Sequence, residues 1–93
     1  EHMRLRYTPQ ALSDIVSIAE YILECNPDAA LRVRHAIQHG VDLVVRYPHL
    51  GALNAYRPGT RSRAVARYPY RIHYAVANET IIILHIRHTS RNP

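Results

Sequence analysis

The sequence contains no lysine and a single cysteine. The first absence leaves arginine as its only permanently cationic side chain, and the second excludes sites that need several cysteines. Cys25 alone cannot form an intramolecular disulfide or a cysteine-built metal site, which is typical of a protein from a reducing cytoplasm. No apolar run approaches the roughly 18 residues that a membrane-spanning helix needs. No charged-then-apolar leader opens the chain. We therefore expect a cytoplasmic protein that does not cross a membrane, with no metal and no cofactor.

Positive charge dominates the composition, and all of it apart from histidine is arginine. The 12 arginines face 7 acidic residues, which gives a formal net charge of +5. Arginine grips carboxylates and phosphates in a bidentate manner, so the composition favours an acidic partner or a nucleic acid. A GC-rich coding sequence also enriches arginine without any functional demand, so the composition leaves both explanations open.

The length of 93 residues predicts one domain that spans residues 1–93. Glu1 and His2 precede Met3 and are interpreted as vector-derived residues outside the fold. The sequence shows no internal repeat, low-complexity tract or linker. A domain of this size buries a modest share of its unfolded surface, so it would gain stability from a partner that covers exposed apolar side chains.

The sequence contains two helix-start signals, each a capping residue followed by proline. Thr8 opens a segment with apolar residues at helical spacing, which predicts a helix over residues 9–24. Asn26 opens a second helix over residues 27–46. The short connection implies an antiparallel helical hairpin. Gly40, in the middle of the second helix, indicates a close approach to the first helix.

The remaining segments have the period of two that is typical of β-strands. Residues 4–7 predict a short first strand, and residues 61–68, 70–76 and 80–88 predict three more. Residues 49–60 contain two glycines and a proline and predict a loop, with at most a fragment of strand. The last strand begins with residues that are apolar on both faces, which indicates a central position in the sheet.

The order β-α-α-β-β-β predicts an α+β fold, in which a helical hairpin packs on one face of a small, mainly antiparallel sheet. The opposite face is then left open. Alternation directs Tyr70 and Ile72 toward the helices and Arg71 and His73 onto the open face. Arg67 is assigned to the neighbouring strand, from which it would converge with Arg71 on an anion-binding surface. An ordinary solvated sheet face is the alternative.

The histidines near the end of the chain do not predict a metal site. His85 and His88 are three residues apart, so in a regular strand they point to opposite faces and cannot share one ion. His88 and Arg91 lie at the frayed end of a central strand, where both are placed to meet one phosphate or carboxylate. A histidine there can also donate or accept a proton near neutral pH. A solvated tail is the alternative.

Three stretches, in this order, carry a resemblance to a known family: YTPQALSDI, RYPHLG and RYPYRIHYAVANETIIILHIRHTSRNP. Together they resemble the ParE/RelE superfamily of toxins from bacterial type II toxin–antitoxin systems, and the sequence is most similar to the ParE branch. The similarity covers nearly the whole chain from Met3. It implies a compact toxin that a cognate antitoxin neutralises by wrapping an extended or helical segment around it. The small size, positive charge and exposed apolar edges of the domain lead us to expect that this segment is acidic and partly disordered.

The resemblance implies one of two targets. ParE toxins act on DNA gyrase, trap its cleaved-DNA complex and stop replication, and this is the function we expect. RelE toxins use the same fold to cleave mRNA on the ribosome, and a RelE-like endonuclease is the alternative.

The resemblance also implies functional roles for individual residues. Arg71 matches the family arginine of the penultimate strand, Arg91 falls near a second phosphate-contacting arginine, and His88 takes the place of the histidine after the last strand. These three would serve a ribonuclease. Two lysines of the RelE pattern are missing, with Ser62 and Ala64 about where they would lie, and the terminal tyrosine is missing too. The incomplete set favours a non-enzymatic toxin. The candidate target-binding residues are Arg61, Arg63, Arg67, Arg71, His88 and Arg91.

Overall fold

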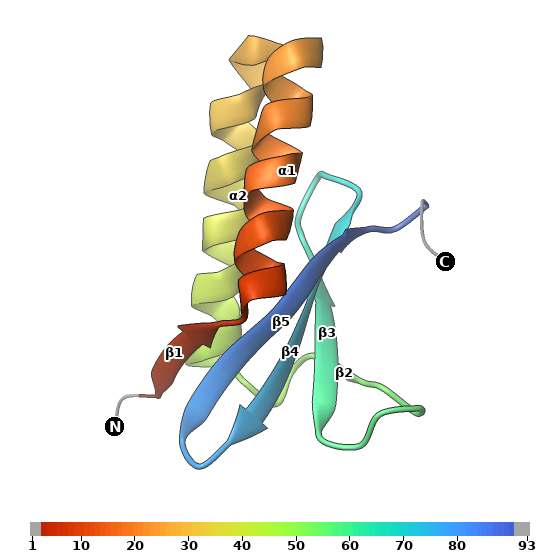
Figure 1. The fold of residues 1–93 in the computed structure, drawn as a ribbon. Helices are drawn as coiled ribbons and strands as arrows, with labels where there is room; N and C mark the ends of the chain where they lie inside the picture. The colour runs from red at the N-terminus through yellow and green to blue at the C-terminus, as the bar shows by residue number, and fades with distance from the viewer. Residues whose placement is uncertain (1–2, 91–93) are drawn as a thin grey trace.

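The fold is taken from a computed structural model that describes residues 3–90. Over this range the elements are β1 (Arg4–Tyr7), α1 (Pro9–Cys25), α2 (Pro27–Arg46), β2 (Ala52–Leu53), β3 (Thr60–Ala64), β4 (Tyr70–Ala77) and β5 (Thr80–His88) (Figure 1). The strands form one sheet in the order β1-β5-β4-β3-β2. β1 runs parallel to β5 and the other neighbours are antiparallel. The expected α+β fold is confirmed.

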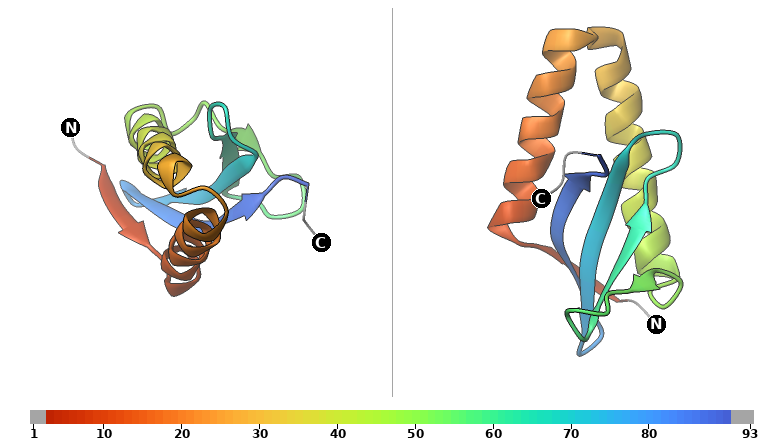
Figure 2. Two further views of the ribbon diagram at one scale, coloured as in Figure 1. Left: turned by 90° about the horizontal axis from the view of Figure 1, so that it is seen from above. Right: turned by 90° about the vertical axis from the view of Figure 1, so that its right-hand side faces the viewer.

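Both helix starts are capped as the sequence predicts. The Thr8 hydroxyl accepts a hydrogen bond from Ala11 N at 3.0 Å, and the Asn26 side chain accepts one from Ala29 N at 3.3 Å. The Asn26 N–H also donates to Ile22 O, so this one residue ends α1 and begins α2. The helices therefore form a tight hairpin, whose tip extends beyond the sheet, as the right panel of Figure 2 shows.

The first helix is tied to one edge of β5. β1 covers that edge only as far as the pair Tyr7–Ile83. Beyond it, the Thr8 hydroxyl donates to Leu84 O at 2.7 Å, and an Asp14 carboxylate oxygen accepts from Ile86 N at 2.9 Å. These bonds satisfy backbone groups that no strand reaches, so the start of α1 takes over where β1 ends.

The core lies between the two helices and the helix-facing side of the sheet, and α1 contributes Ala11 to it. Its main members are the buried residues Val33, Ile37, Val41 and Val44 of α2 and Ile72, Tyr74, Ile81, Ile83 and Ile86 of β4 and β5. A side-chain carbon added at Gly40 would lie 2.8 Å from Ile72 Cδ1. The expectation that this glycine approaches the first helix is therefore corrected, because its close neighbour is the sheet.

The loop after α2 is fixed by buried Tyr74. Its hydroxyl donates to Pro48 O at 2.7 Å and accepts from Gly51 N at 3.2 Å. Short strand β2 follows, so the prediction of a loop with a fragment of strand is confirmed.

Two irregularities decide which side chains reach the open face. β3 ends at Ala64, earlier than expected, and Val65 N bonds to Tyr70 O to close a turn. In the last hairpin, His73 pairs with His85 but Tyr74 pairs with Ile83, so Leu84 is an extra residue. A β-bulge of this kind reverses the alternation after it. It keeps both Ile83 and Ile86 buried on the helix-facing side.

Candidate target-binding surface

The sheet side away from the core, here called the open face, is defined by strand pairing. Residues that pair directly on neighbouring strands project to the same face. Arg71 lies between Ala64 and Arg87, and the next pair along the strands, His73 and His85, continues on the same side. In the right panel of Figure 2 the central strands lie in front of the helical hairpin, which leaves this side of the sheet uncovered.

Arg71 is held in place on the open face by β3. Its Nε donates to the Ser62 hydroxyl at 2.8 Å, and Ser62 itself pairs with His73. Arg71 is half-buried, whereas Arg87 opposite is exposed. The two arginines border a shallow hollow of about 290 Å³, whose lining residues are Arg71, His73, Arg87, His88 and Thr89. The hollow is thus lined mainly by cationic or protonatable side chains.

The two central histidines contact each other edge to face. The ring centroids of His73 and His85 are 4.6 Å apart, at an interplanar angle of 62°. Partial burial, His85 and the flanking arginines 71 and 87 lower the pKa of His73 to about 4. The pKa of His85 is lowered as well, by burial first and then by Arg87 and Arg57, against the opposing effect of Asp14. Both rings are therefore neutral at pH 7.

His88, a candidate from the sequence, belongs to the other side of the strand. It pairs with Tyr70, and the two ring centroids are 5.3 Å apart in an edge-to-face contact. Its Nδ1 accepts a hydrogen bond from Ser90 N at 3.2 Å. His88 borders the hollow, but its ring packs on Tyr70 rather than across the strands from Arg71.

Arg61 and Arg63 do not join Arg71. They pair with Tyr74 and Ile72, two buried residues of the helix-facing side. The Arg61 guanidinium donates to the carbonyl oxygens of His49 at 3.0 Å and Gly51 at 2.9 Å, which anchors the loop after α2. Arg61 and Arg63 therefore lie on the opposite side of β3 from Ser62 and Ala64, and their part in target binding stays a prediction.

Arg67 is also displaced from the predicted cluster. Arg67 does not belong to a strand: it lies exposed in the turn between β3 and β4, with a left-handed φ of 74°. The predicted strand over residues 61–68 could not include it, because that backbone conformation breaks the pairing. Arg91 lies outside the described residues.

Two residues that the sequence reasoning did not assign as candidates, His85 and Arg87, are on the open face. Regular alternation from the buried residues Ile81 and Ile83 would turn them toward the helices. The extra residue Leu84 reverses their direction. A bulge leaves no clear mark in an apolar run, so the sequence carried no signal for it.

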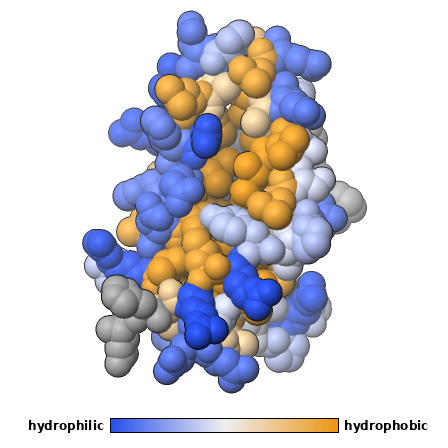
Figure 3. Space-filling view, turned by 60° about the vertical axis from the view of Figure 1, so that its left-hand side comes forward, coloured by the Kyte–Doolittle hydropathy of each residue, from blue (hydrophilic) through white to orange (hydrophobic). Residues whose placement is uncertain are grey.

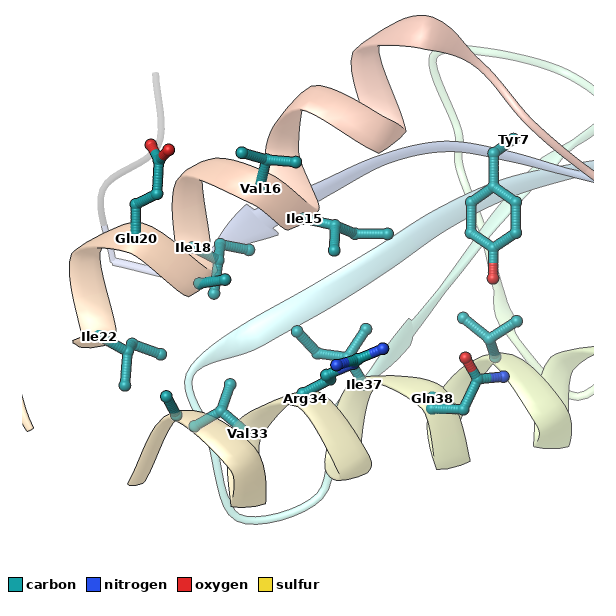
Figure 4. A pocket seen from close by; sticks show the side chains of 13 residues that line it. Tyr7, Ile15, Val16, Ile18, Glu20, Ile22, Val33, Arg34, Ile37 and Gln38 are labelled. Carbon is teal, nitrogen blue, oxygen red and sulfur yellow. The ribbon is translucent and has the colours of Figure 1, made fainter. Parts of the chain in front are cut away.

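A second surface is an apolar groove between the helices. It has a volume of about 390 Å³ and is lined mostly by isoleucine, valine and alanine from α1 and α2, with Tyr7 at one end. Figure 4 shows Ile15, Ile18 and Ile22 of α1 opposite Val33 and Ile37 of α2 across the groove. Figure 3 shows apolar residues gathered on this side of the molecule. Val16, which lines the groove, is 55% exposed. Burial, followed by Asp42, raises the pKa of Tyr7.

Within the described residues we searched for a metal site and for a membrane-spanning helix and found neither. Within residues 3–90, no three side chains of histidine, cysteine, aspartate or glutamate lie close enough together to hold a metal ion. Neither described helix combines the length and apolar character needed to cross a membrane.

Comparison with known proteins identifies similar chains over nearly the full length. Residues 5–93 match the family model described as the ParE toxin of a type II toxin–antitoxin system, parDE. A protein of Caulobacter vibrioides named Toxin RelE2 is 34% identical over 85 residues, which cover 91% of this chain and 93% of the relative.

Solved structures share the fold. A chain from the chromosomal ParDE system of P. aeruginosa superposes with a TM-score of 0.83 at 25% identity, over 96% of this chain and 98% of that one. A chain of the intact E. coli RelBE toxin–antitoxin complex gives a TM-score of 0.72 at 15% identity, over 96% of this chain and 99% of that one. The latter similarity concerns the fold alone.

Proposed function

Because the chain belongs to the ParE toxin family of type II toxin–antitoxin systems, we propose that it inhibits DNA gyrase and is neutralised by a cognate antitoxin. The open face is the proposed target-binding surface. The gyrase target is what similarity to the ParE branch implies. The side chains beside Arg71 support this target indirectly, because they lack the cations that the competing ribonuclease function would need.

The observation that carries the choice is the identity of the β3 residues on the open face. A ribonuclease must stabilise a charged transition state and move protons. Ser62 and Ala64, which fall about where the RelE pattern has lysines, share the open face with Arg71. The adjacent arginines, Arg61 and Arg63, face the other way, so they do not replace the missing cations. The His88 ring packs against Tyr70 instead of Arg71.

A supercoiling assay with purified gyrase tests the proposal. We expect the toxin to inhibit supercoiling and to cause linear, cleaved DNA to accumulate. The double variant Arg71→Gln/Arg87→Gln should lose most of this effect. Arg32→Gln/Arg46→Gln removes the same charge from exposed positions of α2 and is the matched control. Unaltered supercoiling at a large excess of a toxin that still arrests growth would exclude gyrase as the target.

One observation favours mRNA cleavage as a second candidate: the relative from Caulobacter vibrioides is named Toxin RelE2. This function would use Arg71, His88 and Arg91. It requires codon-phased cuts in translated mRNA that disappear in His88→Ala. Intact mRNA in a translation extract that contains active toxin would eliminate it.

The proposed site of antitoxin binding is the groove between α1 and α2, together with the sheet edge at β1, whose Tyr7 lines the groove. An amphipathic segment can lay its apolar face into such a groove. The positive charge of the toxin and Arg34 at the groove favour acidic residues on that segment. If charge contributes, affinity should fall as salt rises.

A further inference from the structure

A single hydrogen bond fixes the direction of the Arg71 side chain on the open face. Arg71 of β4 pairs with Ala64 of β3, which offers no polar side chain, whereas Ser62 lies two residues away along β3. The bond from Arg71 Nε to the Ser62 hydroxyl, 2.8 Å long, therefore runs diagonally between the two strands. Diagonal neighbours in a sheet are about 7–8 Å apart, a span that a side chain as long as arginine can bridge.

Arg87 makes this diagonal direction favourable. It lies directly opposite Arg71 on the other neighbouring strand, β5. Like charges in that arrangement repel each other, so the Arg71 guanidinium is driven toward β3, where the Ser62 oxygen accepts its Nε–H. Arg71 is half-buried in this position, whereas Arg87 is exposed. Of the two opposed arginines, the one on β4 is therefore the restrained one.

The bond also decides which donors of Arg71 stay available. A guanidinium carries five N–H donors, one at Nε and four at the terminal nitrogens Nη1 and Nη2. Ser62 takes the donor at Nε. A partner that forms two parallel hydrogen bonds with Arg71 must then approach the terminal nitrogens. Arg71 lines the shallow hollow on the open face and Ser62 does not, so Ser62 acts on an occupant of the hollow through Arg71 rather than by contact.

We propose that Ser62 is a positioning residue for target binding, whose hydroxyl holds Arg71 so that its two terminal nitrogens meet an acceptor on the target. An unrestrained arginine loses rotamer freedom when a partner immobilises it. Here the folded sheet has already restricted the side chain, so less of that entropy remains to be lost on binding. The same bond disfavours a partner that needs Nε. Ser62 thus contributes both to affinity and to the direction from which the target approaches.

This role rests on the proposed function in one respect, the use of Arg71 in target binding. The restraint itself is a property of the isolated protein and is measured without a target. Growth arrest in cells reports on toxin activity whichever molecule is the target. The two proposals can therefore fail separately: supercoiling that the toxin leaves unaltered argues against gyrase, whereas a freely moving Arg71 argues against the role of Ser62.

Three substitutions test the hydroxyl. Ser62→Ala removes it with little change in volume, and Ser62→Thr keeps it on a residue that is favourable in a strand. Thr60→Val is the matched control, because it removes a hydroxyl from the same strand that donates to the Arg57 carbonyl oxygen and does not hold a guanidinium. Circular dichroism and urea unfolding confirm that each variant is folded.

NMR of the isolated protein measures the restraint. The Arg71 Nε–H signal is identified by its loss in Arg71→Gln. We expect this proton to exchange slowly with water in the unmodified protein, in Ser62→Thr and in Thr60→Val. It should exchange several-fold faster in Ser62→Ala, because the hydrogen bond that protects it is removed.

Growth arrest, titrated by inducer, and gyrase supercoiling measure the consequence. Ser62→Ala should require about three to ten times more toxin for half-maximal inhibition, as expected when the arginine must be immobilised on binding. Ser62→Thr and Thr60→Val should behave like the unmodified toxin. In an Arg71→Gln background, Ser62→Ala should have no further effect, since a double-mutant cycle shows whether one residue acts through the other.

Four results would overturn the role of Ser62. The first is an Arg71 Nε–H that exchanges no faster in Ser62→Ala than in Thr60→Val. The second is full activity of Ser62→Ala. The third is the same loss of activity from Ser62→Ala whether or not Arg71 is present, and the fourth is a failure of Ser62→Thr to retain activity.

Discussion

At the scale of single residues, His73 and His85 make stability depend on pH. The folded pKa of His73, about 4, lies below its ordinary value of about 6.5. Between these two values the unfolded chain binds more protons than the folded chain. Stability therefore rises with pH through this window, and it is lost as pH falls from about 6.5 to about 4. The lowered pKa of His85 acts in the same direction.

Removal of the two imidazoles should weaken this acid sensitivity. We expect the urea midpoint of His73→Gln/His85→Gln to change less between about pH 7 and about pH 5 than that of the unmodified protein, since fewer groups gain protons on unfolding. Phosphate-free buffer avoids stabilisation by a ligand. The control His35→Gln/His39→Gln alters exposed histidines of α2 and should keep the original slope. Parallel curves for all three proteins would contradict the coupling.

At the scale of elements, the junction of α1 with β5 depends on Asp14. Its carboxylate accepts the Ile86 N–H on an edge where β1 has already ended. Asp14→Ala would leave that partly buried donor unpaired, at a cost of about 1–3 kcal/mol in the free energy of unfolding. Asp14→Asn keeps an acceptor oxygen and should cost less. Urea unfolding measures both, and hydrogen exchange at Ile86 should accelerate in Asp14→Ala. Equal stability of the two variants would argue against this role.

The elements that the sequence predicted best are those whose ends are marked by a capping residue or a turn next to them in the sequence. Thr8 and Asn26, each before a proline, set the starts of both helices, and the fold has them there. The last strand was predicted as residues 80–88, and β5 is Thr80–His88. In these cases the capping hydrogen bond or the turn is formed by residues adjacent to the element. The local sequence is therefore sufficient to predict where the element begins or ends.

The parts that could not be predicted depend on partners far away in the sequence. The polar stretch of Arg61, Ser62 and Arg63 has no apolar side, so nothing local says which side faces the core. Pairing with β4 decides it and turns both arginines toward the helices. The bulge at Leu84 is set by the same pairing. The sequence therefore predicted an open cationic sheet face that contains Arg71. It did not predict that His85 and Arg87 would be the neighbours of Arg71 on that face.

At the scale of the whole molecule, the two proposed surfaces lie far apart. The groove faces the viewer in Figure 3 and the open face does so in the right panel of Figure 2, and these views look from nearly opposite sides. A segment that fills only the groove cannot cover the open face. Neutralisation must then involve a longer antitoxin segment that continues around the sheet edge, or an indirect effect. Either way, antitoxin binding and target inhibition should be separable by mutation.

The separation predicts opposite phenotypes for two variants. Val16→Glu places a charge in the groove at a half-exposed position of α1, where glutamate is compatible with the helix. It should keep toxicity but weaken antitoxin binding at least about tenfold, ~1.4 kcal/mol, because it removes apolar contact and repels an acidic partner. Arg71→Gln/Arg87→Gln should lose toxicity and still bind the antitoxin through the groove.

Growth assays with and without the antitoxin, and calorimetry of each complex, measure both effects. Leu53→Glu is the matched control for Val16→Glu, because Leu53 is 69% exposed on β2 and does not line the groove. It should remain toxic and be rescued by the antitoxin. If the antitoxin rescues Val16→Glu as fully as it rescues Leu53→Glu, with equal affinity for both, the groove is not its main binding site. The apolar side chains between the helices would then need another occupant.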